Sequence, residues 1–290
     1  MRSIGQASEK LFVTQPALSK SIRQLETDLQ AKLFDRTPLG VIPTVFGELL
    51  AQHARVIRSE MRHAELELAG LRGAVSGQVA IGVGPSIAAK LMPAAARRMR
   101  AHRPGIHLTV TEGLVDNLIP ALRRGELDLA VGSWPCIADS DLTAEVLMKD
   151  QLCVIAGPTH PLCSRDRIEL AELLEYPWTL PPESQRWRQL VEETFLAQGL
   201  APPVPAMVSN SAAFIRTVVW QGEYLSYLPL QSLPAGAPNQ DLKALRCDAL
   251  TRSIDVTVTY RERAVMSPAA QAILNSFREV IAEVGAASTL

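Results

Sequence analysis

Residues 14–25 constrain the fold most strongly, because they predict one short helix with two unlike faces. Thr14 is suited to cap the start of the helix, and Pro16 falls in the first turn, where its missing N–H costs nothing. Apolar side chains at helical spacing predict a buried stripe: Ala17, Leu18, Ile22 and Leu25. The remaining face carries hydrogen-bond donors: Gln15, Ser19, Lys20 and Arg23.

A second short helix is expected just upstream, at residues 4–11, followed by an apolar turn at Phe12 and Val13. Two small helices joined by a tight turn, with the polar helix second, are the elements of a helix-turn-helix. Gln and Ser side chains suit the edges of DNA bases, whereas Lys and Arg suit phosphates. The pair therefore indicates a DNA-reading unit, with an amphipathic helix pair in an all-α domain as the alternative.

Residues 7–26 resemble the DNA-binding motif of LysR-type transcriptional regulators. Residues 33–37 resemble the wing entry of that bacterial family, and residues 44–47 resemble the start of its linker helix. The resemblance implies a winged helix-turn-helix domain over residues 1–44. It assigns DNA contacts, with the two arginines on phosphates, to Thr14, Gln15, Pro16, Ser19, Lys20, Arg23, Arg36 and Thr37.

The chain departs from the family pattern at two points. The family has a further helix ahead of these two, and we expect the DNA-binding domain to be incomplete because Met1 falls where that helix should already have ended. Ile4, Leu11 and Leu18 would then be exposed. A second hypothesis follows, a solute-binding sensor module that no longer binds DNA. The other departure is Leu39, at a wing turn where relatives often carry a basic residue.

The length of 290 residues exceeds that of one ordinary domain, and a hydrophobic content of 47% suffices for packed cores. The net charge is −1, and residues 1–44 hold six Lys and Arg against four Asp and Glu. Affinity for DNA must therefore come from the placement of charges and from duplication in an oligomer.

The cysteines and histidines indicate a reduced, cytoplasmic chain without a metal site. The four cysteines show no CxxC spacing, and the five histidines lack ligand spacing. A redox switch that uses Cys153 and Cys163 stays open as an alternative. No apolar run approaches the roughly 20 residues of a membrane span, and the N-terminus lacks the apolar core of a signal peptide.

Residues 45–76 predict one long helix followed by a glycine-containing hinge. A narrow apolar stripe on an otherwise charged helix needs a partner helix, so the segment predicts dimerisation. The alternative is that the stripe packs on the chain's own body. The stripe is a heptad seam made of Leu50, Ala54, Ile57, Met61, Ala64, Leu68 and Leu71.

Residues 77–290 alternate short apolar strands with helices, which predicts a parallel α/β sheet covered on both faces. The strings at residues 125–132, 157–162 and 176–178 resemble the effector domain of the same family. That domain has two α/β lobes, like those of periplasmic solute-binding proteins.

The resemblance implies that lobe I comprises residues 77–150 and 255–290, and that lobe II comprises residues 151–254. The expected fold class is therefore α+β and multidomain. It combines a winged helix-turn-helix, a long linker helix and a two-lobed α/β effector domain.

Ligands of open α/β sheets bind outside the carboxyl ends of the strands, near helix starts. Ser86 stands at the first such point, where its hydroxyl either grips an oxygen-rich ligand or only caps the helix. Relatives often place Thr or Ser where Val115 stands, so the effector chemistry should differ here. The candidate effector contacts are Pro85, Ser86, Ile87, Leu114, Val115, Ser133, Trp134, Ser209, Asn210 and Tyr227.

An enzymatic role is not expected. Residues 82–87 begin like a dinucleotide fingerprint but end in Ile87 instead of glycine, and Ser86 lacks the flanking glycines of a nucleophile elbow. The resemblance implies instead a sequence-specific regulator that a small-molecule effector controls, with no cofactor or metal. Its expected partners are double-stranded DNA with dyad-related half-sites, the effector, and copies of itself, as a dimer and by family precedent a tetramer.

Overall fold

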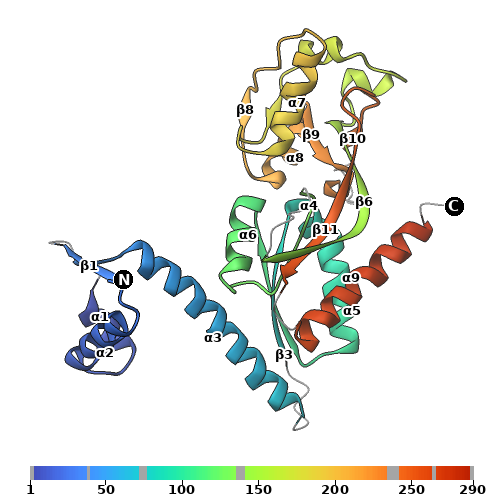
Figure 1. Ribbon diagram of the computed structural model, residues 1–290. Helices are drawn as coiled ribbons and strands as arrows, with labels where there is room; N and C mark the ends of the chain where they lie inside the picture. The colour runs from blue at the N-terminus through green and yellow to red at the C-terminus, as the bar shows by residue number, and fades with distance from the viewer. Residues whose placement is uncertain are drawn as a thin grey trace. The chain divides into compact units, whose positions relative to one another are not determined.

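The computed structural model describes residues 3–37, 40–71, 77–134, 141–233, 242–262 and 266–287 (Figure 1). Contacts divide the chain into two units, residues 1–62 and 63–290. None of the helices in the described ranges combines the length and the hydrophobicity that a membrane crossing requires.

The first unit contains two short helices, a two-stranded sheet and the start of a long helix: α1 (Ile4–Lys10), α2 (Gln15–Asp28), β1 (Phe34–Thr37), β2 (Gly40–Pro43) and α3 (Val45–Leu71). Thr14 caps α2, because its Oγ1 accepts a hydrogen bond from the N–H of Ala17 at 3.4 Å. β1 and β2 pair antiparallel. The predicted helix-turn-helix and wing are confirmed.

The turn between α1 and α2 includes Phe12, whose φ of 54° lies in the left-handed region. The N–H of Val13 donates to the carbonyl of Ser8 at 3.1 Å and closes the turn. Phe12 is 96% exposed. The turn therefore owes its shape to backbone hydrogen bonds rather than to burial of this side chain.

The predicted burial of the apolar stripe on α2 is wrong for the described residues. Leu18 and Ile22 are half-buried, whereas Ala17 and Leu25 are exposed. The reason is geometric, because α1 packs against α2 but is only seven residues long and covers only part of the stripe.

Glu26 joins α2 to the wing, a link that the sequence pattern does not reveal. Its Oε1 accepts the N–H of Leu33 at 2.8 Å and the N–H of Phe34 at 3.2 Å. One carboxylate thus satisfies two backbone donors at the point where β1 begins, and it fixes the entry of the wing relative to α2.

α3 begins where residues 44–47 predict it. The Oγ1 of Thr44 accepts the N–H of Gly47 at 3.1 Å and donates to the carbonyl of Lys32 at 2.6 Å. An ideal Cβ on Gly47 would stand 2.0 Å from the carbonyl oxygen of Leu33. The start of the helix therefore rests directly on the backbone of the wing entry, with no room for a side chain.

The seam of α3 is largely exposed where its side chains are described. Ile57, Met61 and Leu68 are 61%, 62% and 57% exposed, and only Leu50 is half-buried. The side chain of Leu71 and the predicted hinge at residues 72–76 lie outside the described residues. An apolar stripe left open in this way is what a partner helix would cover, and dimerisation stays a prediction.

The second unit is built on a seven-stranded sheet of order β10-β6-β11-β5-β3-β4, in which β9 also pairs with β6. β3 is parallel to β4 and β5, whereas β11 is antiparallel to β5 and β6. The sheet is therefore mixed, and the expected parallel pairing holds only for β3, β4 and β5 within it. The strands are β3 (Gly77–Val83), β4 (Ile106–Glu112), β5 (Leu129–Gly132), β6 (Leu142–Ala156), β9 (Ser226–Pro229), β10 (Lys243–Ala244) and β11 (Arg252–Arg261).

β6 is longer than the sequence pattern indicates, because it begins at Leu142 and not near residue 151. Its last five residues are buried and produce the apolar run that the sequence shows, whereas residues 143–149 are half-buried or exposed. A strand that is only partly buried, as residues 143–149 are, is typical of antiparallel pairing. β6 pairs with β11 along ten positions and both strands extend through the two lobes (Figure 1).

Lobe I carries helices against the sheet: α4 (Pro85–Ala89), α5 (Leu91–His102), α6 (Val115–Arg123) and α9 (Pro268–Ala287). The single helix predicted near residues 86–102 is broken at Lys90, whose φ and ψ are −129° and −58°. The largest core cluster packs α5 and α9 on β3, with Ile81, Leu91 and Phe277 fully buried.

Lobe II contains α7 (Arg186–Ala197), α8 (Ala212–Gln221), β7 (Thr179–Leu180) and β8 (Met207–Val208), with 3-10 turns η1 (Pro161–Ser164), η2 (Leu170–Glu175) and η3 (Leu230–Ser232). Lobe II has a hydrophobic core of its own, in which Trp178 packs edge-on against Phe195 with ring centroids 6.4 Å apart. Along β6 the two cores meet between Met148 and Leu152. The two-lobed architecture is confirmed, and the boundaries at residues 150 and 255 stay a prediction.

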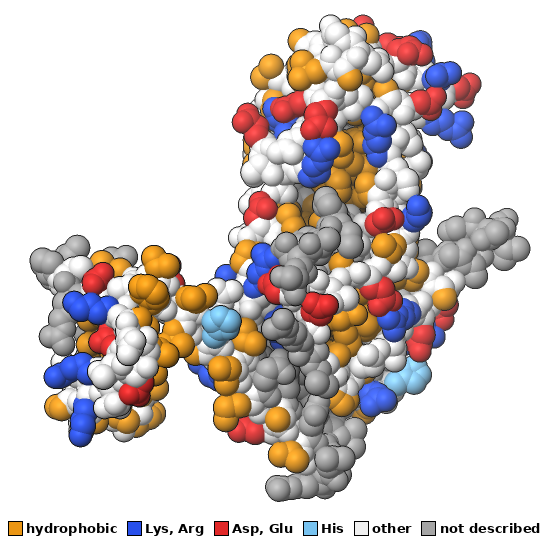
Figure 2. Space-filling model, in the orientation of Figure 1, with side chains coloured by type: hydrophobic (Ala, Val, Ile, Leu, Met, Phe, Trp, Pro, Cys, Tyr) orange, Lys and Arg blue, Asp and Glu red, His pale blue; other side chains and the backbone are white. Residues whose placement is uncertain are grey.

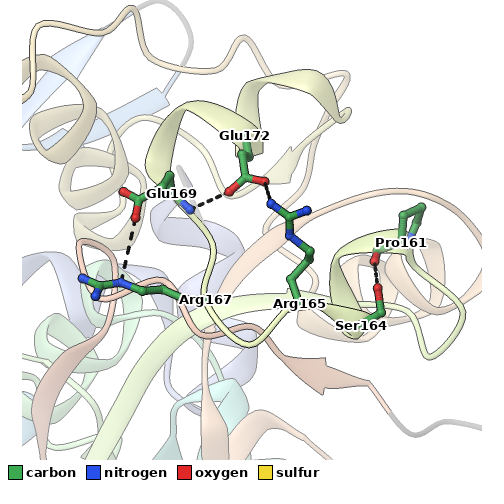
Figure 3. Close-up of polar contacts among 6 residues, drawn as sticks. All are labelled: Pro161, Ser164, Arg165, Arg167, Glu169 and Glu172. Atoms are coloured by element: carbon green, nitrogen blue, oxygen red, sulfur yellow. Dashed lines mark hydrogen bonds and ion pairs between the residues drawn. The ribbon is translucent and has the colours of Figure 1, made fainter.

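Glu172 organises one surface segment of lobe II (Figure 3). Its Oε2 accepts the N–H of Glu169 at 2.9 Å, and its Oε1 accepts from Arg165 at 2.7 Å. The side chain of Glu169 in turn caps the start of η2, which completes a reciprocal capping box. This network fixes the chain directly after the motif at residues 157–162.

His160, within that motif, is a buried structural histidine. Its Nδ1 accepts the N–H of Leu162 at 3.2 Å, and its ring packs on Tyr176 with centroids 4.5 Å apart. Burial lowers the pKa of the imidazole below its ordinary value of 6.5, and Glu223 opposes this effect. Burial therefore favours the neutral form of the His160 imidazole in the folded protein.

Acid should destabilise lobe II through His160. Because the unfolded chain takes up this proton more readily, the contribution to the free energy of unfolding is complete above about pH 6.5 and falls as the pH drops below that value. Urea unfolding of the wild type and of His160→Gln, from about pH 7.5 to pH 5, should show the wild-type advantage shrink with acid. A difference that stays constant over this range would contradict the assignment.

Candidate functional site

The outward face of α2 presents four side chains without a partner. Gln15, Lys20 and Arg23 are exposed, and Ser19 is half-buried. Within the described residues these side chains make no hydrogen bond or ion pair, unlike Gln24, which bonds within the helix. Figure 2 shows Lys and Arg side chains on the visible surface of this unit. Neutral donors for base edges and cations for phosphates are thus free on one helix.

The other predicted DNA contacts serve the fold or cannot be placed. Pro16 is exposed in the first turn of α2, and the Thr14 hydroxyl caps that helix. The Oγ1 of Thr37 donates to the carbonyl of Gly40 at 3.0 Å, so its proton is engaged within the wing. The Arg36 side chain and the wing turn at residues 38–39 lie outside the described residues.

A cleft of about 110 Å³ lies between the two lobes. Its lobe I wall is formed at the carboxyl ends of β3, β4 and β5, and its lobe II wall at the starts of α7 and α8 and at the end of β9. This is the place where open α/β sheets bind ligands. About 10–15 Å³ of such volume holds one water, so a ligand on the order of ten heavy atoms fits.

Eight of the ten predicted effector contacts line this cleft: Pro85, Ser86, Leu114, Val115, Ser133, Trp134, Ser209 and Asn210. Ile87 and Tyr227 do not line it, and their assignment is corrected. Ile87 is fully buried in the core of lobe I, and Tyr227 is fully buried in the core of lobe II. The residues of β9 that line the cleft are instead Leu228 and Pro229, at the carboxyl end of the strand.

Most of the lobe II wall was missed by sequence reasoning. Residues 181–187 follow β7, a two-residue strand that is too short to produce a sequence pattern. One of them, Gln185, donates from Nε2 to the carboxylate of Asp116 in lobe I at 3.1 Å. The missed lining residues are Pro181, Gln185, Arg186, Trp187, Ala212, Ile215, Leu228, Pro229 and Ser232.

Two serine hydroxyls in the cleft lack a partner within the described residues. The alternative that Ser86 only caps the helix is wrong, because Gly84 is the N-cap of α4 and Pro85 occupies the first position. Ser86 is only 6% exposed, and its hydroxyl makes no hydrogen bond within the described residues. The Oγ of Ser133 is also buried without a partner. Buried hydroxyls normally bond, so both are available to a ligand.

Trp134 forms the aromatic part of the lobe I wall. Its Nε1 donates to the Oγ1 of Thr259 at 3.3 Å, which anchors the indole. The ring lies against Gly132, where an ideal Cβ would stand 1.9 Å from its Cζ3 atom. The missing side chain at position 132 is therefore what lets the indole occupy the carboxyl end of β5.

The redox alternative for Cys153 and Cys163 finds no support. Burial raises the pKa of the Cys153 thiol to about 12, and it also raises the pKa of the Cys163 thiol. The thiolate is the reactive form, so both thiols are poor nucleophiles at neutral pH. The described part of the chain also contains no group of three or more His, Cys, Asp and Glu side chains that could hold a metal ion.

A winged helix-turn-helix with a free donor face and a two-lobed α/β domain with a cleft together define a DNA-binding regulator with a solute-binding domain. Residues 1–48 match the bacterial regulatory helix-turn-helix protein model of the lysR family, and residues 72–282 match the LysR substrate binding domain. The chain belongs to the LysR family. It is a DNA-binding transcriptional regulator and not an enzyme.

A named relative agrees with this family, and solved structures share the fold. The transcriptional regulator GalR of Pseudomonas putida is 29% identical over 93% of this chain and 68% of its own length. A full-length OxyR variant from Pseudomonas aeruginosa shares the fold with a TM-score of 0.70 at 21% identity, over 97% of this chain and 89% of that one. CbnR in complex with its target DNA gives a TM-score of 0.65 at 18% identity, over 96% and 94% of the two chains.

Proposed function

We propose that α2 reads dyad-related DNA half-sites and that a small molecule bound between the lobes controls this regulator. The observation that carries the first part is the set of free donors on α2, Gln15, Ser19, Lys20 and Arg23. Residues 1–44 would form the DNA-binding domain, residues 45–76 the dimerising linker and residues 77–290 the effector domain. Such a regulator works in the cytoplasm, where bacterial DNA lies.

Pairing through the seam of α3 supports the dyad. Its exposed apolar residues, such as Ile57 and Met61, would be covered by the same helix of a second copy. Two recognition helices would then read two half-sites, and two copies of a weakly basic unit would supply the electrostatic affinity that one lacks. Tetramers would follow the precedent of the family.

Replacing Gln15 or Ser19 by alanine should reduce discrimination between specific and non-specific DNA by about 1–3 kcal/mol for each lost base contact. Replacing Lys20 should weaken binding to all sequences alike and lower the salt dependence, because a phosphate contact is lost. Gel shifts on the DNA upstream of the gene, with a scrambled duplex at fixed salt, measure both effects.

Gln24→Ala is the matched control for these variants. Gln24 lies on the same helix but bonds to Asp28 at 2.9 Å, so its loss should not alter specificity. An unchanged specificity ratio in the Gln15 and Ser19 variants would refute their placement. If the wild type shifts no DNA while a ligand still binds, the sensor-module hypothesis is favoured instead.

The cleft carries the second part of the proposal. Replacing Ser86 by alanine removes a hydroxyl without a partner in the described residues, so ligand binding should weaken by a factor of about ten while the fold stays intact. A thermal-shift screen of small metabolites against the wild type and Ser86→Ala measures this effect. DNA affinity without ligand should be equal in both proteins. A ligand that stabilises both proteins equally would place its site elsewhere.

A further inference from the structure

We propose that the effector is a small monoanion with a flat apolar body, and that Arg216 is the cation that selects its charge. This inference rests on the proposed function, because it names the ligand class of the same cleft. Arg216 was not among the residues expected from the sequence, and it stands just behind the cleft wall on α8.

The charges around the cleft favour an anion. No Asp or Glu is among the described residues that line it, whereas Arg186 is. Arg186 is already paired, since its guanidinium lies 2.6 Å from Glu193. Asp116, a carboxylate of lobe I that directly follows the lining residue Val115, is engaged by Gln185. An additional cation would therefore decide the local potential.

Arg216 is that cation. Arg216 does not itself line the cleft, but it lies one helical turn after Ala212 and directly after Ile215, both of which do. Its Nη1 donates to the carbonyl of Ser232, another lining residue, at 3.0 Å. The guanidinium is thus held next to a residue of the cleft wall, with its other donors left over.

The guanidinium of Arg216 is half-buried and has no carboxylate within ion-pair distance among the described residues. Burial lowers its pKa, and the more distant Glu112 opposes this effect. A partly desolvated cation without a close counter-ion carries an electrostatic cost that a ligand carboxylate would relieve. The two unpartnered hydroxyls of Ser86 and Ser133 would donate to the remaining oxygen lone pairs.

The rest of the wall fits a flat apolar body. Two tryptophans line the cleft, Trp134 from lobe I and Trp187 from lobe II, beside aliphatic residues such as Leu114 and Leu228. Aromatic rings pack best against other flat faces, stacked or edge-on. With room for on the order of ten heavy atoms, a single ring that carries one acidic group satisfies these constraints.

The test compares three probes of nearly equal size on the full chain by isothermal titration: benzoate, its neutral amide benzamide, and the non-planar cyclohexanecarboxylate. Benzoate should bind at least about tenfold more tightly than either of the others. Arg216→Gln should weaken benzoate by about 10- to 100-fold and leave benzamide unchanged. Arg216→Lys keeps the charge and should retain most of the preference for benzoate.

Arg97→Gln, an exposed arginine on α5, is the matched control and should alter none of the three affinities. Val115→Trp fills the cleft and should abolish binding of every probe, which assigns the probes to this site. Equal affinity for benzoate and benzamide, or an unchanged benzoate affinity in Arg216→Gln, would overturn the charge assignment. Equal affinity for benzoate and cyclohexanecarboxylate would overturn the inference that the ligand has a flat body.

Failure of this inference and failure of the proposed function give different results. If the wild type binds none of the probes but the metabolite screen finds a neutral ligand that Val115→Trp excludes, the inference is wrong and the cleft remains the effector site. If ligands bind equally well to Val115→Trp, the cleft itself is not the effector site.

Discussion

Gly47→Ala is expected to disrupt the first unit and to abolish DNA binding by the full chain. The added Cβ would stand 2.0 Å from the carbonyl oxygen of Leu33 and 3.0 Å from its carbonyl carbon. These are backbone atoms that Glu26 and Thr44 hold in place, so they cannot move aside as a flexible side chain could. The expected loss of stability is about 3 kcal/mol, at the upper end for overpacking.

Limited proteolysis of the wing and gel shifts on the same preparation measure this effect. Gly5→Ala is the matched control, because a Cβ there would meet only side-chain atoms at 3.6 and 3.7 Å. Alanine inside helix α1 should be neutral or stabilise it by about 0.5–1 kcal/mol. Wild-type protease resistance and DNA binding in Gly47→Ala would show that the wing entry is not packed on α3 as described.

Gly132→Ala should displace Trp134 from the cleft and weaken ligand binding together with stability. The Cβ would stand 1.9, 2.4 and 2.5 Å from three atoms of the indole ring. The ring cannot turn away without breaking its hydrogen bond to Thr259 and leaving its packing in the core of lobe I. The expected cost is about 2–3 kcal/mol, with an altered tryptophan fluorescence spectrum. Thermal unfolding and ligand titration measure the two losses.

Gly84→Ala is the control for this variant, at the neighbouring strand end of the same cleft. A Cβ there would lie 3.5 Å from Gly132 and 3.6 Å from Trp134, which is ordinary contact. The double variant Gly132→Ala/Trp134→Leu should recover most of the stability, because the smaller side chain removes the clash. No recovery in the double variant would mean that the indole ring is not what the added methyl group meets.

The parts of the fold that sequence reasoning predicted correctly are those with local signals. Thr14 and Pro16 mark the start of α2, and the apolar spacing in residues 45–71 marks α3, because caps and periodicity depend on neighbours in the chain. The wing came from resemblance alone. What the local signals could not show is how completely a stripe is covered, and Ala17 and Leu25 are exposed for that reason.

The errors in the predicted cleft residues have a common physical origin, because each comes from a shift of one or two positions along a helix or a strand. Pro85 takes the first helical position, so Gly84 and not Ser86 is the cap, and Ile87 turns into the core. On β9 the residues that line the cleft are Leu228 and Pro229, one and two positions after Tyr227. The antiparallel course of β11 depends on contacts between distant residues, which strand patterns do not encode.

The two strands that both lobes share, β6 and β11, also determine how the effector domain can move. Lobes joined by flexible linkers could swing freely, whereas here any reorientation has to twist a hydrogen-bonded ribbon. The ladder already shifts register between Val256 and Thr257, and a bulge of this kind is where added twist is most easily taken up. The domain would therefore resist reorientation of its lobes elastically and return to one resting geometry.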